Sequence, residues 1–270
     1  MTAPNHPSST GIVCASMPIR TSASAIWHAI ADADGLCNWM PTHATVEPGV
    51  GGSISMSWNG AYASTSRIVA WEPDHHLELA FAFGDLDVRQ RWTIEPHDGG
   101  VILHLEHGPF PDPTFHDAVR RGWAFELRGL RLYLERHPEA RRTVTSAVGH
   151  TSDPFESIWA TLAPRLLTEP VRGGVLAEGE RCTVHGPDGP GRAIVQVHEP
   201  PLDLAVLLPD LDDAYFRLRL DPDWGGELTS PDPTKPTRTI NLWLSTWNIP
   251  PEAVAAWQTH LTTLSSCLPT

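Results

Sequence analysis

The stretch Trp123-Ala-Phe-Glu-Leu-Arg-Gly-Leu-Arg-Leu-Tyr-Leu134 repeats large apolar side chains in steps of four, three and four residues. Those steps place the side chains on one face of an α-helix. We predict a long helix from Phe115 to His137, because the apolar spacing runs through this segment and Pro138 ends it. The run from Trp257 to Leu268 shows the same steps, so the sequence contains this helix twice.

Other features recur between the two halves in the same order. The recurring pairs are Trp27 and Trp159, Gly52 and Gly179, Glu72-Pro73 and Glu199-Pro200, Arg91 and Arg217, and Gly99-Gly100 and Gly225-Gly226. A repeat with so long a period is normally one folding unit that has been duplicated. The sequence therefore predicts two domains, residues 1–138 and 143–270, with the second copy degenerate.

Within the first copy, alternation of apolar and polar residues predicts strands. Ser53–Trp58 and His76–Phe81 alternate strictly, and Gly- and Pro-containing turns separate such runs. We expect an opening strand at Ile12–Ile19, two short helices, about six antiparallel strands and the long helix. The second copy has fewer residues between Trp159 and Gly179, so its second short helix should be lost or reduced. The expected fold class is α+β.

Composition narrows the possible partners. The formal net charge is −13, which argues against nucleic acid and against anionic membrane surfaces. No apolar run approaches the ~20 residues that a membrane-spanning helix needs. The four cysteines form no C-x-x-C motif. Residues 1–10 are polar and contain proline, so we expect no secretory signal there. A single lysine, Lys235, among many arginines is typical of a GC-rich genome. We expect a bacterial cytoplasmic protein.

Several segments of the first half resemble a known family. They are Ser24–Ile30, Leu36–Met40, Val69–Pro73, Arg91–Pro96 with Gly99-Gly100, and Gly122-Trp123. In this order and spacing the chain resembles the AHSA1-like family, named after the activator of the Hsp90 ATPase, in the START/Bet v 1 helix-grip (SRPBCC) superfamily. The resemblance implies an antiparallel sheet curled around a long C-terminal helix in each domain, with a cavity between them. It also implies binding or processing of hydrophobic small molecules.

The aromatic residues of the first half are the candidate ligand-binding residues. An apolar pocket with a few polar groups is the usual small-molecule site, and the alternative is that these rings only fill the core. The second short helix, Gly35–Met40, should lie at the cavity mouth with Trp39 and Met40 directed inward. The candidates are Trp39, Met40, Trp58, Trp71, Phe81, Phe83, Trp92, His104, Phe110 and Trp123.

Two further groups offer weaker chemistry. His104 and Glu106 share a strand face and could form an acid–base pair or two metal ligands inside the cavity, whereas His107 lies on the other face. A transition-metal site needs three or four converging ligands, so we expect no metal and no cofactor. Arg89 and Arg91 could clamp a ligand carboxylate, but they fit the solvated face of a sheet better.

The sequence thus favours non-catalytic binding of a hydrophobic small molecule, as a carrier or sensor, in the first domain. A cyclase- or hydrolase-like enzyme acting in the same cavity is one alternative. A co-chaperone-like module, with an unidentified protein partner, is the other.

Overall fold

The computed structural model describes residues 11–58, 62–83, 86–168, 175–222 and 237–267. By its internal contacts the chain divides into two compact units. The first holds Met1–Cys37 and Pro41–Leu127, and the second holds Asn38–Met40 and Arg128–Thr270. The long helix α3 (Pro113–Arg136) spans this division. The domain limits at residues 138 and 143 therefore remain a prediction.

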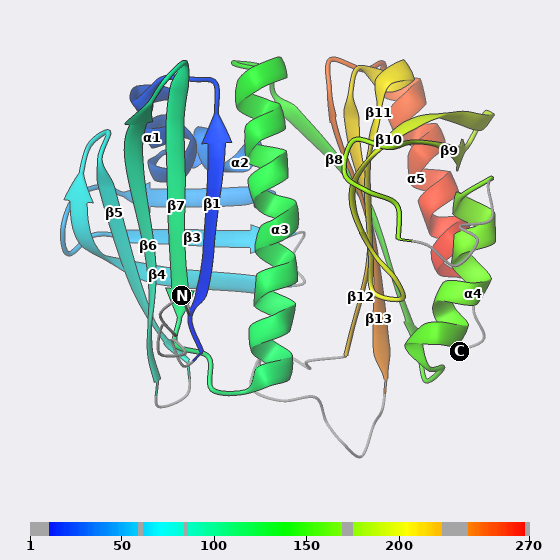
Figure 1. Cartoon of the computed structure of the whole chain (residues 1–270), viewed down its shortest axis with the longest axis horizontal. Helices are drawn as coiled ribbons and strands as arrows, with labels where there is room; N and C mark the ends of the chain where they lie inside the picture. Colours follow the sequence, from blue (N-terminus) through cyan, green and yellow to red (C-terminus); the bar gives the residue numbers. More distant parts are fainter. Residues whose placement is uncertain (1–10, 59–61, 84–85, 169–174, 223–236, 268–270) are drawn as a thin grey trace, which may run out of the picture. The chain divides into compact units, whose positions relative to one another are not determined.

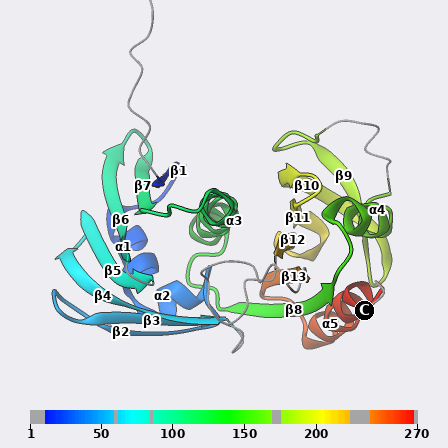
Figure 2. The ribbon, with the colours of Figure 1, turned by 90° about the horizontal axis from the view of Figure 1, so that it is seen from below.

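The first unit is built on a 7-stranded antiparallel sheet with the order β1-β7-β6-β5-β4-β3-β2 (Figure 1). The strands are β1 (Val13–Ile19), β2 (His43–Glu47), β3 (Ser53–Trp58), β4 (Tyr62–Glu72), β5 (His76–Phe83), β6 (Leu86–His97) and β7 (Gly100–Gly108). Figure 2 shows the sheet curling, with α1 (Ala23–Ala31) and α2 (Ala33–Cys37) inside the curve. Ser22 caps α1 by accepting a hydrogen bond from the N–H of Ala25 at 3.1 Å.

Period-two alternation decides which side chains face the inside of this curve. Along β6, Val88, Gln90, Trp92 and Ile94 are buried, while the residues between them are half-buried. On α3, Trp123, Leu127, Leu130 and Leu134 are all buried, as the helical spacing predicts.

The second unit repeats this plan with a 6-stranded antiparallel sheet of order β8-β13-β12-β11-β10-β9. Its strands are β8 (Arg142–Thr151), β9 (Arg181–Gly186), β10 (Gly189–Glu199), β11 (Asp203–Leu208), β12 (Ala214–Pro222) and β13 (Arg238–Trp247). Helix α4 (Phe155–Leu166) follows the first strand, and α5 (Pro251–Ser265) packs on β8 and β13. A short 3-10 helix, η1 (Pro209–Leu211), joins β11 to β12.

The two units share details as well as strand order. The β4–β5 register shifts between Ile68 and Ala70, and the β10–β11 register shifts between Val195 and Val197. The second unit has no counterpart of β2, and no helix lies between α4 and β9 in the residues described there. The predicted α+β class with two antiparallel sheets is confirmed, whereas the loss of the second short helix stays a prediction because residues 169–174 lie outside the described residues.

Candidate functional site

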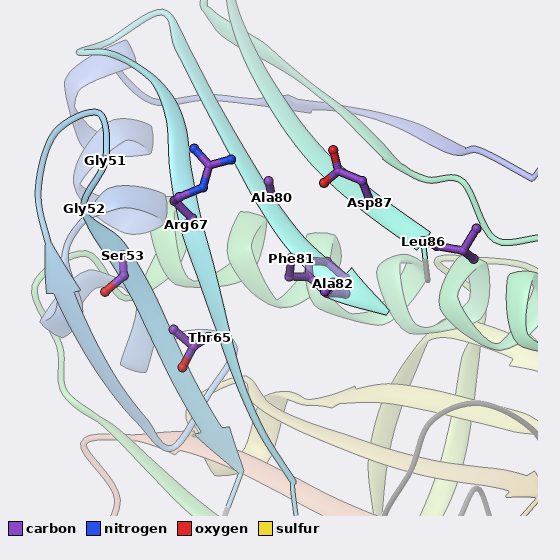
Figure 3. Close-up of a pocket in the computed structure, with 10 residues that line it drawn as sticks. All are labelled: Gly51, Gly52, Ser53, Thr65, Arg67, Ala80, Phe81, Ala82, Leu86 and Asp87. Carbon is purple, nitrogen blue, oxygen red and sulfur yellow. The ribbon is translucent and has the colours of Figure 1, made fainter. Parts of the chain in front are cut away.

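A pocket of about 560 Å³ opens in the first unit where β4 and β5 separate (Figure 3). The last paired residues of the two strands are Arg67 and Ala80. Beyond them, β4 continues alongside β3 and β5 continues alongside β6, so the strands diverge. The lining residues are Gly51, Gly52, Ser53, Thr65, Arg67, Ala80, Phe81, Ala82, Leu86 and Asp87. The volume lies within the ~300–1,000 Å³ of ordinary ligand sites.

The rim of this pocket is polar. The hydroxyl groups of Thr65 and Ser55 lie 2.8 Å apart, and Asp87 accepts hydrogen bonds from Arg89. Arg67 is exposed, and within the described part of the chain its guanidinium has no hydrogen bond or ion pair. The rim therefore offers a cation that is available to a ligand.

One lining residue of the pocket, Phe81, also belongs to a cluster of aromatic rings. The Phe81 ring lies edge-on to His107, with the ring centroids 5.7 Å apart. His107 in turn lies 4.8 Å from Phe110 and 5.7 Å from Trp123. Trp92 meets Trp123 edge-on at 5.3 Å. Phe81 is thus the residue shared by the pocket and the cluster.

His107 is the polar centre of this cluster. The indole Nε1–H of Trp123 donates a hydrogen bond of 2.9 Å to Nδ1 of His107. The other ring nitrogen, Nε2, is buried and has no hydrogen-bond partner among the described residues. Burial lowers the pKa of His107 from 6.5 to about 3, because the charged ring would lose its hydration. The ring is therefore neutral near pH 7.

Geometry fixes the position of the His107 proton. An indole N–H can only donate, so Nδ1 must be the acceptor and the neutral ring carries its proton on Nε2. The result is a buried N–H donor that the described residues leave unsatisfied.

Gln90 adds a second polar group to the same inner face. It pairs with His107 across β6 and β7, and it is only 5% exposed. Directly paired side chains on one sheet face lie close enough to interact. Within the described residues the Gln90 amide makes no side-chain hydrogen bond. Two polar side chains with unused hydrogen-bonding capacity therefore lie together among aromatic rings.

The second unit fills the matching positions with apolar side chains. By strand order and register, Phe216 on β12 and Leu244 on β13 correspond to Gln90 and His107, and they also pair with each other. Both are fully buried in an apolar core. Trp257, the counterpart of Trp123, lies 6.2 Å from the Phe216 ring.

In the second unit, the place that corresponds to the opening between β4 and β5 lies at the end of the β10–β11 pairing, and η1 covers it. After Leu208, η1 lies against β10, where Asp210 forms an ion pair with Arg192, and Leu211 packs on the core. The polar pair and the open pocket are thus features of the first unit in the described structure.

The structure brings together four of the predicted ligand-binding residues, namely Phe81, Trp92, Phe110 and Trp123. Trp71 lies apart from them, edge-on to Trp27 at 4.9 Å. Trp58 is half-buried at the end of β3, and the side chain of Phe83 lies outside the described residues.

The expected position of the cavity mouth stays a prediction. Trp39 and Met40 are only 2% and 5% exposed, and neither lines the described pocket. These two apolar side chains are buried, and the opening described above lies between β4 and β5.

His104 and Glu106 are corrected, because they do not lie in an enclosed site. They point to the outer face of the sheet, where His104 contacts Ser16 at 2.8 Å and Glu95 at 3.2 Å. The Glu106 carboxylate is 54% exposed and lies near Arg91. Arg89 and Arg91 also lie on this face, and both form ion pairs with Glu78. Arg89 and Arg91 thus lie on the solvated face of the sheet, as expected from the sequence.

Sequence reasoning did not select His107 or Gln90 as site residues. Strand parity contained the signal, because Gln90 alternates in phase with Val88 and Trp92, and His107 lies in phase with Leu105. The described residues hold no group of three or more His, Cys, Asp or Glu side chains that could bind a metal ion. None of the described helices is both long and apolar enough to cross a membrane.

Comparison with known proteins supports the family resemblance for the first half. Residues 20–135 match the family described as activator of Hsp90 ATPase homolog 1-like protein. This match covers the pocket and the His107 cluster and confirms the resemblance there. No curated protein matches the chain by sequence.

Similar solved structures are more distant. The Aha1 dimer from Colwellia psychrerythraea is 20% identical with a TM-score of 0.43, over 46% of this chain and 96% of that one. A protein from Mesorhizobium loti is 20% identical with a TM-score of 0.43, over 47% of this chain and 98% of that one. DynU16, from the dynemicin biosynthetic locus, is 14% identical with a TM-score of 0.44, over 94% of this chain and 95% of that one.

Proposed function

We propose that this protein, whose residues 20–135 match the activator of Hsp90 ATPase homolog 1-like family, binds a hydrophobic small molecule in its first unit. The family match and the fold support a ligand-binding or co-chaperone-like module. The narrower proposal is a non-catalytic carrier or sensor that works in the bacterial cytoplasm.

One observation carries this proposal. Phe81 lines a pocket of about 560 Å³ and also contacts the aromatic cluster around His107. A ligand placed at Phe81 and Leu86 would bury apolar surface, which is the main driving force for binding such molecules. Arg67 on the rim could hold a polar or anionic end of the ligand in contact with water.

The chemistry of the described histidines favours binding over acid–base catalysis. His104 and Glu106, the pair expected for an enzyme, lie on the outer face. The pKa of His107 is lowered by burial to about 3, so this ring does not take up a proton near neutral pH. An efficient general base needs a pKa near the working pH.

The test is to fill the pocket without disturbing the core. Ala82 is exposed and lines the pocket, so Ala82→Trp places a large ring in the opening. Binding of 8-anilino-1-naphthalenesulfonate is measured by calorimetry, with unfolding midpoints as a check on folding. We expect the native chain to bind with a negative heat-capacity change, and Ala82→Trp to weaken binding at least tenfold.

A matched control adds the same ring elsewhere. Ala255 is exposed on α5 of the second unit, and Ala255→Trp should leave binding unchanged. Equal binding by Ala82→Trp and the native chain would rule out this pocket as the ligand site. Native mass spectrometry of protein purified from its source would then identify the natural ligand.

A further inference from the structure

The proposed function leaves the chemistry of the ligand open, and the following inference rests on it. We infer that the ligand of the first unit is a largely aromatic molecule whose neutral ketone or quinone oxygen accepts a hydrogen bond from Nε2–H of His107. Gln90, paired with His107 on the inner face, provides a second hydrogen-bonding group beside that oxygen.

The unsatisfied donor is the first step of the argument. Trp123 occupies Nδ1 of His107 through a hydrogen bond of 2.9 Å, which leaves the proton on Nε2. Nε2 is buried without a partner among the described residues. A buried donor without an acceptor costs free energy, so an acceptor that enters this place is bound with a net gain.

The surroundings determine the charge of the acceptor. The rings around His107 are those of Phe81, Phe110 and Trp123. A carboxylate would lose its hydration among these rings, and the neutral imidazole offers no charge to compensate it. A neutral carbonyl loses much less. The edge-on contacts within the cluster also favour an aromatic ligand, because its rings can pack in the same geometry.

The route to this donor leads past Phe81. Phe81 lines the open pocket, its ring centroid lies 5.7 Å from that of His107, and its side chain is only half-buried. We expect a ligand that enters between β4 and β5 to contact Phe81 on its way to His107. Rotation of that ring about its side-chain bonds would bring the ligand oxygen to Nε2, while the rest of the ligand stays in the pocket.

The second unit has apolar side chains at the positions that correspond to His107 and Gln90. Its matching pair is Phe216 and Leu244, both fully buried and apolar. The fold does not need polar side chains at these positions. His107 and Gln90 are therefore best explained by what they bind.

The experiment compares two probes of the same shape. 2-Acetonaphthone carries a carbonyl oxygen, and 2-isopropenylnaphthalene replaces that oxygen with a methylene group. Both are titrated by calorimetry and by tryptophan fluorescence into the full chain. We expect the ketone to bind about fivefold more tightly, which corresponds to about 1 kcal/mol.

Variants locate the effect. His107→Leu, which copies Leu244, should reduce the ketone preference to about one while the alkene still binds. His107→Gln keeps an N–H donor and should retain part of the preference. The matched control is His104→Leu, which removes a histidine from the outer face of the same strand and should leave the preference for the ketone over the alkene unchanged.

The outcomes separate this inference from the proposed function. If neither probe binds, and 8-anilino-1-naphthalenesulfonate does not bind, the proposed function fails. If both probes bind the native chain equally, binding stands and the carbonyl assignment is wrong. Should His107→Leu not fold, ¹⁵N-histidine spectra of the native chain decide the question: the ketone, and not the alkene, must shift the Nε2 resonance of His107.

Discussion

The indole N–H of Trp123 on α3 donates a hydrogen bond of 2.9 Å to Nδ1 of His107 on β7. This bond links the long helix to the sheet of the first unit. Because an indole can only donate, the bond also determines which nitrogen of the imidazole holds the proton. A contact within the core thus creates the unsatisfied Nε2–H donor on which the ligand inference depends.

The first prediction concerns this tautomer. In ¹⁵N-histidine spectra, His107 should show the neutral Nε2–H pattern at pH 7 and keep it at pH 5, since burial lowers its pKa to about 3. Trp123→Phe removes the donor to Nδ1 and should produce a mixture of tautomers. A charged ring at pH 5, or the Nδ1–H form at pH 7, would contradict the geometry.

The second prediction follows from the same pKa. The unfolded ring titrates at 6.5 and the folded ring at about 3, so below pH 6.5 the unfolded state binds more protons. The stability that His107 supports is complete above pH 6.5 and is lost as the pH falls toward 3. When the pH falls from 7 to 5, the free energy of unfolding should fall in both the native chain and the His107→Gln variant. We expect this fall to be about 2 kcal/mol smaller in the variant.

Urea unfolding at the two pH values checks this difference. His137, His198 and His260 also have pKa values lowered by burial, so the native chain should become less stable in acid for several reasons. Comparison with the single variant isolates His107. Parallel losses in the two proteins would show that the ring is charged, or exposed, in the folded state.

Much of the fold could be predicted because it depends on periodicity. The steps of four, three and four placed Trp123 and Leu127 on a buried helix face, and the repeat predicted a second sheet with the same strand order. These features depend on local spacing, which a sequence displays directly.

The site was harder to predict because it depends on pairing between strands. That Gln90 lies beside His107 follows from the β6–β7 register, and that the pocket opens beside Phe81 follows from where β4 leaves β5. Neither distance along the chain nor composition reveals these relationships. Strand parity separated His107 from His104 in the sequence analysis, but only the contact with Trp123 identifies the nitrogen that has no partner among the described residues.

The third prediction tests the helix face. Leu127 is 2% exposed, and Leu127→Ala should lower the free energy of unfolding by about 2–5 kcal/mol because it leaves a cavity. Leu261→Ala on α5, where the leucine is 0% exposed, should cost a similar amount. The control Val50→Ala, at a residue 70% exposed, should change stability by less than about 0.5 kcal/mol. Equal midpoints for Leu127→Ala and the control would place this face in solvent.

The fourth prediction revises the role of Trp39. Its side chain is 2% exposed, so Trp39→Ala should lower stability by about 3–5 kcal/mol rather than act on a ligand. Trp58→Ala, at a half-buried position, should cost clearly less. If Trp39→Ala keeps its unfolding midpoint and loses only ligand affinity, the cavity mouth lies at the short helix after all.

The last prediction separates function from structure at Gln90. The Gln90 residue is only 5% exposed and its amide has no side-chain hydrogen bond among the described residues, while the second unit has Phe216 at this place. A buried polar group without a partner destabilises a fold, and an apolar side chain of similar size removes that cost. Gln90→Leu should therefore raise the free energy of unfolding by about 1 kcal/mol.

The same substitution should act in the opposite direction on the ligand. If the Gln90 amide forms a hydrogen bond with the ligand oxygen, Gln90→Leu should lower the affinity for 2-acetonaphthone and leave the affinity for 2-isopropenylnaphthalene unchanged. Gln258→Leu, on α5 where the amide donates a hydrogen bond of 2.9 Å to the backbone oxygen of Ser146, should leave the affinity for both probes unchanged. If the Gln90 side chain served only to stabilise the fold, its replacement would lower the free energy of unfolding of the protein. A gain in stability together with a loss of ketone affinity is expected only for a side chain kept for binding, and a loss of both would return Gln90 to the structural core.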